Sequence, residues 1–314
     1  MSRIQVTVGP ANANFMGSDH LTIQAAVDYV VALGGGAVRI RPGVYEMGNS
    51  LFLRPGVRII GSGDETVLRK RDGTTTPLVE SVDWYEESVR VQDPSIFQVG
   101  SGIWFEGMSP FYQGRNQIAK RTVIGIDGDR IFLDKAPRED FWLESGANAS
   151  TSFPVITAEY VNDAAVESLM IDGNRANNPH LDDNHAGAVF IQDCDRIEFR
   201  NLTIRDFNSD GISAQICDDL IVDNCRISNC ADLLEEHAGL LPIDGRVRQA
   251  RPEGADPLSP RQRQVWDLRE KGLTYKQISE KLGTTMGSVS ATLHEARRRL
   301  GVTREQVLEE NRRR

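Results

Sequence analysis

The side chains best suited to chemistry gather in one polar stretch, residues 173–187, which reads GNRANNPHLDDNHAG. His180 and His185 lie there among carboxylates and amides, including Asp183. Oxygen ligands of this kind suit calcium, and the same composition suits a solvated loop without metal. We expect no metal or other cofactor, with calcium as the alternative. A lyase mechanism beside calcium would also need a basic side chain, for which Arg175 is one of several candidates.

A second candidate for chemistry is the run Asn208-Ser209-Asp210-Gly211, in which a carboxylate lies beside an amide. Asn, Ser, Asp and Gly are also the residues that favour turns, so a purely structural role for this run stays open. The chemistry available to either stretch depends on the elements that place its side chains.

A short sequence repeat positions the second candidate, and its apolar and polar residues alternate as in β-strands. The matched pairs, all at an offset of 23, are Cys194 with Cys217, Asn201 with Asn224, and Ile204 with Ile227. So short a unit cannot bury its own apolar face, so the units must stack, with equal positions about 4.8 Å apart. Val166 matches Phe199 at an offset of 33, which predicts a ten-residue insertion within residues 173–187.

The N-terminal residues predict a cap for this stack. Apolar residues follow helical spacing at Ile23, Ala26, Val27, Val30 and Val31. Gly34-Gly35-Gly36 would end that helix, and an I-x-P-G-x-Y strand follows at residues 40–45. This order resembles the N-terminal cap of pectate-lyase-like right-handed β-helix proteins. The resemblance implies a mainly β fold, a right-handed parallel β-helix with an N-terminal cap helix over its open first turn.

The run around Asp210 is in addition similar to the Asn-Thr-Asp element of polygalacturonase-like β-helix hydrolases. That resemblance implies acid–base work by Asp210 on a glycosidic bond, with Asp172, Asp182 or Asp183 as the second carboxylate. Inverting hydrolysis needs two carboxylates roughly 6.5–9.5 Å apart. Asn208, His185 and Arg175 would then bind the substrate.

Residues 78–145 interrupt the repeat and predict a small β insertion, with a hairpin that turns at Asp127-Gly128. The segment is rich in aromatic residues. We expect most of them in the core of the insertion, and a sugar-binding platform is the alternative.

Residues 258–314 differ in kind, because they contain four successive helix starts. Ser259-Pro260 opens the first helix, and Thr274 with Gln277 forms a capping box for the second. Thr285 and Thr303 would cap the third and fourth helices. The apolar residues expected to face inward on the third helix are Val289, Leu293, Ala296 and Leu300.

This segment resembles the helix-turn-helix module of LuxR-type regulators and is also similar to region 4 of sigma factors. The resemblance implies an all-α helix-turn-helix domain whose third helix enters the major groove of DNA. The residues expected to contact DNA are Lys276, Thr285, Ser288, Ser290, His294, Arg297 and Arg298. A small helical bundle used for protein contacts is the alternative.

Charge is divided unequally along the 314 residues. Residues 256–314 contain 13 Lys and Arg against 8 Asp and Glu, whereas the preceding residues contain 23 against 37. A basic end on an acidic body suggests two modules with different partners. No apolar run is long enough to span a membrane, and no apolar signal core is present, so we expect a cytoplasmic protein without a membrane partner.

We expect a β-helix at residues 1–234, a linker at 235–257 and a helix-turn-helix domain at 258–314. The first functional hypothesis is a DNA-binding protein whose β-helix binds carbohydrate or a protein partner. The second is a polysaccharide-active enzyme, a glycoside hydrolase or a lyase, on the β-helix. The third is a structural solenoid, similar to a phage tail, which would form a homo-oligomer.

Overall fold

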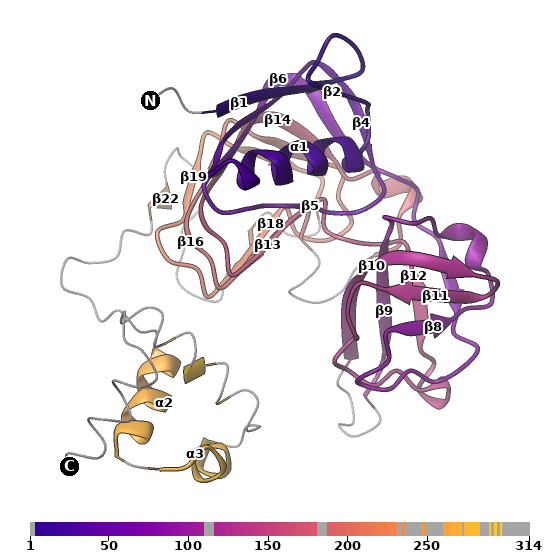
Figure 1. Ribbon diagram of the computed structural model, residues 1–314, viewed down its shortest axis with the longest axis vertical. Coiled ribbons are helices and arrows are strands. Elements are labelled where there is room, and N and C mark those ends of the chain that lie inside the picture. Colours follow the sequence, from indigo (N-terminus) through magenta and orange to yellow (C-terminus); the bar gives the residue numbers. More distant parts are fainter. Residues whose placement is uncertain are drawn as a thin grey trace. The chain divides into compact units, whose positions relative to one another are not determined.

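The computed structural model describes residues 4–109, 116–180, 187–230, 234–235, 247–248, 260–271, 273–282, 289, 292–293 and 296. The chain divides into two compact units, Met1–Ala250 and Arg251–Arg314. The first unit is mainly β, and the described residues of the second are mainly helical (Figure 1).

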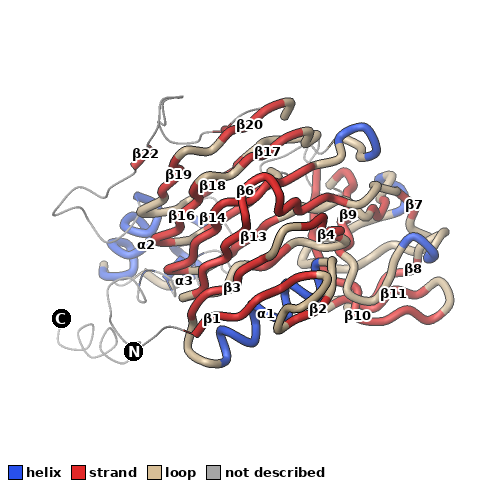
Figure 2. Tube along the Cα trace, turned by 90° about the horizontal axis from the view of Figure 1, so that it is seen from above, coloured by secondary structure: helices blue, strands red, loops and turns tan. Residues whose placement is uncertain are grey.

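The first unit coils as a parallel β-helix with three faces, and strands of successive turns lie side by side (Figure 2). The first face contains β1 (Ile4–Gly9), β3 (Gly36–Ile40), β6 (Val57–Lys70), β14 (Asn162–Asp172), β16 (Asp195–Arg200) and β19 (Ile221–Asp223). The second contains β4 (Gly43–Met47), the later parts of β6 and β14, β17 (Thr203–Arg205) and β20 (Arg226–Ser228). The third contains β5 (Leu51–Phe52), β13 (Ile156–Glu159), β15 (Val189–Gln192), β18 (Ile212–Gln215) and β21 (Leu234–Glu235).

The strand register confirms the predicted repeat. The pairs observed include Phe199 with Val222, Ile204 with Ile227 and Val166 with Phe199. Asp172 pairs with Arg205 at the longer offset, and Val189 pairs with Ile212 at the shorter one. The ten-residue excess therefore falls between Asp172 and Val189, where the sequence predicted it.

The corners of the coil are formed by residues in the left-handed backbone region, which asparagine and aspartate tolerate better than most side chains. Asn201 and Asn224 have φ angles of 53° and 51°. Asn224 Nδ2 donates to Asn201 Oδ1 at 2.7 Å, and Asn229 Nδ2 donates to Asp206 Oδ1 at 2.6 Å. These side-chain ladders tie consecutive turns together, and the first of them is the predicted asparagine ladder.

The predicted cap helix is α1 (His20–Ala32), and β2 (Phe15–Met16) lies beside β1 just before it. Asp19 accepts a hydrogen bond from the Thr22 backbone N–H at 2.9 Å, which satisfies a free donor at the helix start. One side of the helix is buried against the β-helix core, through His20, Ile23, Ala26, Val27 and Val30. The helix therefore covers the apolar end of the first turn.

The insertion is a six-stranded antiparallel sheet between the second and third faces of the third turn. Its strands are β7 (Thr75–Pro77), β8 (Ser88–Arg90), β9 (Gly102–Met108), β10 (Asn116–Asp127), β11 (Arg130–Leu133) and β12 (Asn148–Ser150). β10 and β11 form the predicted hairpin, with Asp127 opposite Arg130. The sheet extends beyond the predicted bounds of 78–145, because β7 and β12 pair with each other.

The aromatic residues of the insertion divide between its core and its surface. Phe97 and Phe105 are buried in its own core, as expected, and Trp104 packs against the core of the β-helix. Trp84 and Tyr85 are exposed. Short 3-10 helices lie at Pro94–Ile96, Leu143–Ser145 and Arg175–Asn177.

The stretch expected as a linker contributes β22 (Val247–Arg248), which pairs antiparallel with β19. In the second unit, α2 (Pro260–Glu270) and α3 (Tyr275–Leu282) are described. The predicted capping box is present, since Thr274 N donates to Gln277 Oε1 at 2.9 Å and Gln277 N donates to Thr274 Oγ1 at 3.3 Å. A core of Val265, Trp266, Leu268, Ile278, Val289, Leu293 and Ala296 holds the unit together.

Candidate functional sites

One corner of the β-helix, between its second and third faces, carries two long connections of the first unit. The third turn leaves the coil there for the insertion, and the fourth turn leaves it for residues 173–187. The short connection between β17 and β18 contains Asn208 and Asp210. Stacking therefore brings the two chemical candidates of the sequence to the same edge of the molecule, on neighbouring turns.

The run around Asp210 is buried rather than exposed, since Asn208, Ser209 and Asp210 keep 4%, 4% and 6% of their surface accessible. Backbone groups fix its shape, because the Asp210 carbonyl accepts from Ala188 N at 2.8 Å and the Asn208 carbonyl lies 2.7 Å from His180 Nδ1. Both polar atoms of the Asn208 amide lack a hydrogen-bond partner. A buried amide without partners is costly and rare, so this side chain is available for a ligand group or an ordered water.

Lys70, which the sequence analysis did not single out, lies fully buried at the end of β6. Its Nζ is 3.2 Å from Ser152 Oγ and lies over the rings of Phe153 and Phe207, at 5.3 Å and 4.9 Å from their centroids. Burial lowers the pKa of Lys70 to about 7. The burial of Lys70 could have been predicted from the alternation of residues along the strand, because Leu68 is buried two residues before it and Arg69 between them is exposed.

Asp172 and Arg175 come together in a hollow of about 410 Å³, which also contains Asp206 and Asn229. Asp172 Oδ2 accepts from an Arg205 nitrogen at 3.1 Å, and Asp172 Oδ1 accepts from Asn174 N at 3.0 Å. The guanidinium of Arg175 donates to the Asn229 carbonyl at 3.0 Å. Asp210 and Asn208 are not among the residues that line this hollow.

The other two candidates of the polar loop, Asp183 and His185, lie outside the described residues. The carboxylate pair required for hydrolysis and the calcium alternative therefore stay predictions. Among the residues that the structure describes, no group of three or more His, Cys, Asp or Glu side chains could hold a metal ion.

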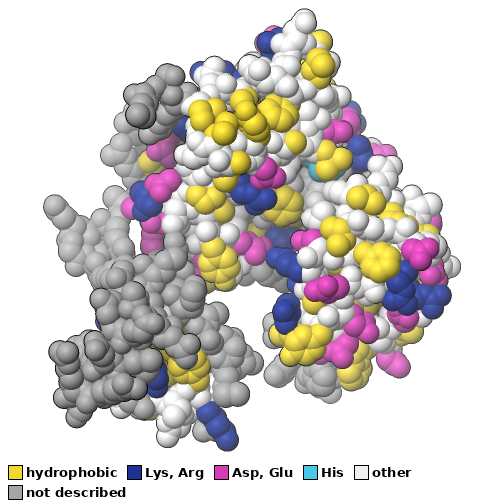
Figure 3. All heavy atoms as spheres, viewed as in Figure 1, with side chains coloured by type: hydrophobic (Ala, Val, Ile, Leu, Met, Phe, Trp, Pro, Cys, Tyr) yellow, Lys and Arg dark blue, Asp and Glu magenta, His cyan; other side chains and the backbone are white. Residues whose placement is uncertain are grey.

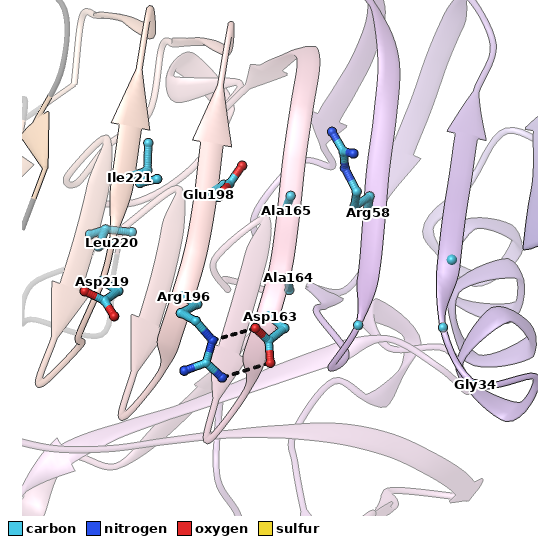
Figure 4. A pocket seen from close by; sticks show the side chains of 13 residues that line it. Gly34, Arg58, Asp163, Ala164, Ala165, Arg196, Glu198, Asp219, Leu220 and Ile221 are labelled. Atoms are coloured by element: carbon cyan, nitrogen blue, oxygen red, sulfur yellow. Dashed lines mark hydrogen bonds and ion pairs between the residues drawn. The ribbon is translucent and has the colours of Figure 1, made fainter. Parts of the chain in front are cut away.

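A groove of about 800 Å³ lies on the outer side of the first face (Figure 4). Small residues form much of its surface, including Gly35, Gly56 and Ala165. A Cβ atom on Gly35 would lie 2.8 Å from the Gly56 carbonyl oxygen, and Gly35 has a φ of +98°, so this wall needs glycine. The groove was not predicted from the sequence, although small residues at stacked positions could have indicated it.

Charged pairs cross the surface of this groove. The guanidinium of Arg196 donates to both carboxylate oxygens of Asp163, at 2.6 Å and 2.9 Å (Figure 4). These bonds hold the pKa of Asp163 below its usual value. Arg58 and Glu198 flank Ala165 in the strand register, so a positive and a negative group lie on its two sides along the coil axis.

In the second unit, Lys276 is exposed in the first turn of α3, and its contact with DNA stays a prediction. Of the positions predicted to face inward on the third helix, Val289, Leu293 and Ala296 are buried, which confirms that side. The other expected DNA contacts, Thr285, Ser288, Ser290, His294, Arg297 and Arg298, lie outside the described residues.

Comparison with known families identifies both parts of the chain. Residues 160–241 match the family model of the right handed beta helix region, and residues 256–300 match that of sigma-70, region 4. The parallel coil is thus a right-handed β-helix, and the C-terminal residues are a helix-turn-helix domain that is similar to region 4 of sigma factors. The likeness to LuxR-type regulators stays a prediction. No curated protein sequence matched the chain.

Solved structures with similar folds include two modules from Azotobacter vinelandii and one phage protein. The A-modules of the mannuronan C-5 epimerases AlgE6 and AlgE4 are 16% and 18% identical, cover 66% and 68% of this chain and have TM-scores of 0.37 and 0.33. The gp54 tailspike of Acinetobacter baumannii bacteriophage AP22, solved with a capsular saccharide, is 12% identical over 66% of this chain, with a TM-score of 0.25. This chain spans 40%, 43% and 43% of the three structures, in the order given.

No described helix is long and apolar enough to cross a membrane.

Proposed function

We propose that this protein binds duplex DNA through its C-terminal module and an extended carbohydrate through its β-helix. The observation that carries the first half is the match of residues 256–300 to sigma-70 region 4. The described core supports it, because the apolar positions of that motif are buried together. The excess of positive charge in residues 256–314 supports it further, since phosphate contacts dominate affinity for DNA.

The β-helix half of the proposal is supported by two surfaces. The groove of the first face runs along the coil axis and presents charged groups of both signs. Just beneath the surface of the polar corner, the buried amide of Asn208 has a donor and an acceptor without partners. A polymer rich in hydroxyl groups can satisfy both kinds of group at once, because each hydroxyl both donates and accepts.

The full chain is expected to bind mixed-sequence duplex DNA with an affinity that falls steeply between roughly 50 and 200 mM salt. Replacing Arg297 and Arg298 together by alanine should weaken binding roughly 10- to 100-fold and reduce the salt slope by about two, because two phosphate contacts are lost. Fluorescence anisotropy with labelled duplexes measures both quantities. Lys276→Ala alone should have a smaller effect in the same direction.

A matched control removes the same charge from the β-helix. Arg54 and Arg226 are exposed there, and each pairs with an aspartate on the surface. Their double replacement by alanine should leave DNA affinity nearly unchanged. Equal losses in both double variants, or no binding by the wild type at about 50 mM salt, would exclude the DNA-binding half of the proposal.

Hydrolysis or elimination at the corner is a second candidate function, favoured by the burial of Asp210 beside the unpaired amide of Asn208. If the corner is catalytic, Asp210→Asn should abolish product formation from polyuronides, because the amide cannot exchange a proton. Reducing-end and unsaturated-product assays distinguish hydrolase from lyase. Asp64→Asn, at an exposed carboxylate, is the matched control. Full activity in Asp210→Asn would remove Asp210 from the site.

A further inference from the structure

A second cleft, of about 360 Å³, lies where the insertion meets the outer side of the third face. Strand β10 of the insertion contributes Lys120 and Thr122, and β13 contributes Thr157 and Glu159. The side chain of Thr157 points outward, because its neighbours Ile156 and Ala158 belong to the β-helix core. Dark blue Lys and Arg side chains are visible where the insertion faces the coil (Figure 3).

Lys120 is the feature of this cleft that calls for a ligand. Its ammonium nitrogen is buried without a hydrogen-bond partner, although its aliphatic stem leaves the side chain 18% exposed. Glu159 Oε1 lies 3.7 Å from that nitrogen, which is too far for a hydrogen bond, and the Phe190 ring centroid lies 4.1 Å from it. An ammonium group has three N–H donors, and a contact with a ring face satisfies none of them as an acceptor oxygen would.

Two further buried donors without partners lie beside Lys120. Thr157 Oγ1 has no partner, and Thr157 pairs in register with Phe190, over whose ring Lys120 lies. Trp104 Nε1 has no partner either, and Trp104 is directly opposite Lys120 in the β9–β10 ladder, so both side chains leave the same side of the hairpin. The cleft lining therefore contains an ammonium and a hydroxyl without partners, and the unpaired indole N–H of Trp104 belongs to a buried residue next to that lining.

We propose that this cleft binds the oxyanion of a small acidic ligand, a carboxylate or a phosphate monoester, with Lys120 as counter-ion and Thr157 as hydrogen-bond donor. An anionic oxygen accepts several hydrogen bonds at once and also neutralises the buried ammonium. The volume corresponds to a ligand of about one or two sugar rings. Lys120 and Thr157 belong to neither the groove nor the DNA-binding module, so the proposal goes beyond the function proposed above.

Charge around the cleft favours entry of an anion. Its lining contains four cationic side chains, Arg54, Lys120, Arg121 and Lys135, against the two carboxylates of Asp134 and Glu159. Asp134 accepts a hydrogen bond from Thr122 N at 2.7 Å, and Arg54 pairs with Asp28. The positive excess left in the cleft attracts an acidic ligand more than a neutral one.

The test is isothermal titration of the full chain with three probes: glucuronate, glucose 6-phosphate and glucose. At least one of the two anions should bind, the better of them identifying the oxyanion, and neutral glucose should bind at least tenfold more weakly. Lys120→Met should lower the anion's affinity about tenfold or more, because a charge-assisted hydrogen bond is lost. Thr157→Val should lower it about threefold, and Lys281→Met, at an exposed lysine of α3, should change nothing.

The affinity of the cleft for an anion should also fall as the pH rises. Burial is the main cause that lowers the pKa of Lys120 to about 8; Lys135 and Arg121 lower it further, and Glu159 acts in the opposite sense. The amine loses its charge above that value, so anion affinity should fall as the pH rises from about 7 to 9, and this fall should be absent in Lys120→Met.

Two results would overturn the proposal. One is the absence of binding by both anions at millimolar concentration, and the other is unchanged affinity in a folded Lys120→Met variant. If that variant does not fold, as judged by circular dichroism, the near-isosteric Thr157→Val decides. Binding by the wild type that Thr157→Val does not weaken would place the anion elsewhere.

Discussion

Replacing Lys70 by methionine is expected to raise the free energy of unfolding at pH 7 by about 2–4 kcal/mol. The ammonium of Lys70 is fully buried, and burial lowers its pKa from 10.5 to about 7. On folding, Lys70 must either lose its proton or keep its charge in the apolar interior. The cost is about 1.4 kcal/mol for each unit by which its pKa is lowered. The contacts with Ser152 and the two rings offset part of this cost.

The sign of the pH dependence follows from the same shift. Between pH 7 and 10.5 the unfolded chain holds the Lys70 proton more tightly than the folded chain, so the contribution of Lys70 to stability rises with pH. The advantage of Lys70→Met should therefore be largest at or below pH 7 and should fall to about 1 kcal/mol or less near pH 10. Urea unfolding of both proteins, followed by the β-sheet signal in circular dichroism, measures this difference at each pH.

Arg69→Met is the matched control, because Arg69 is the preceding residue on the same strand and is exposed. It should change stability by no more than about 0.5 kcal/mol at any of these pH values. A Lys70→Met variant that is less stable than the wild type at pH 7 would mean that the ammonium is better satisfied in the fold than its burial indicates.

Phe199→Ala is expected to lower the free energy of unfolding by about 3–5 kcal/mol, the usual cost of deleting a buried aromatic ring. Phe199 is fully buried, and its strand β16 lies between β14 and β19, so the ring has turns of the coil on both sides. The cavity left by the missing ring cannot be filled by a shift of the neighbouring turns, because the strand pairing fixes their spacing.

Val222→Ala provides the comparison one turn further along. Val222 occupies the position equivalent to Phe199 but is only half-buried, so its loss should cost about 1 kcal/mol. Chemical unfolding of both variants measures the two losses of unfolding free energy and so gives their ratio. Similar costs at both positions would contradict the view that each turn is stabilised by its neighbours on both sides.

The stacked repeat could be predicted because its rule is local. The constant offsets, the asparagines at the corners and the alternating strands each follow from short-range backbone preferences, and the observed register obeys them. The capping box at Thr274 was predictable for the same reason, since the motif ends at Gln277, within one helical turn.

The features that the sequence analysis missed depend on contacts between distant residues. Lys70 meets Ser152 and Phe207 only because the chain returns to the same corner, first after the whole insertion and again two turns later. The cleft around Lys120 requires the insertion to dock on the third face, and no spacing within β10 predicts that partner. Residues 173–187, by contrast, could be singled out because they break the repeat, and the run around Asp210 because of its residue types.

The turns of this coil differ widely in length yet keep one register. Val38 pairs with Ile59 after one short turn, whereas Ile59 pairs with Val166 only after the chain has completed the insertion, and the later turns are short again. The inserted residues leave the coil and re-enter it at the corner between the second and third faces. There β7 and β12 pair with each other, so the two ends of the insertion lie side by side. The differences in turn length are therefore taken up at that corner, and the register of the stacked strands is the same before and after it.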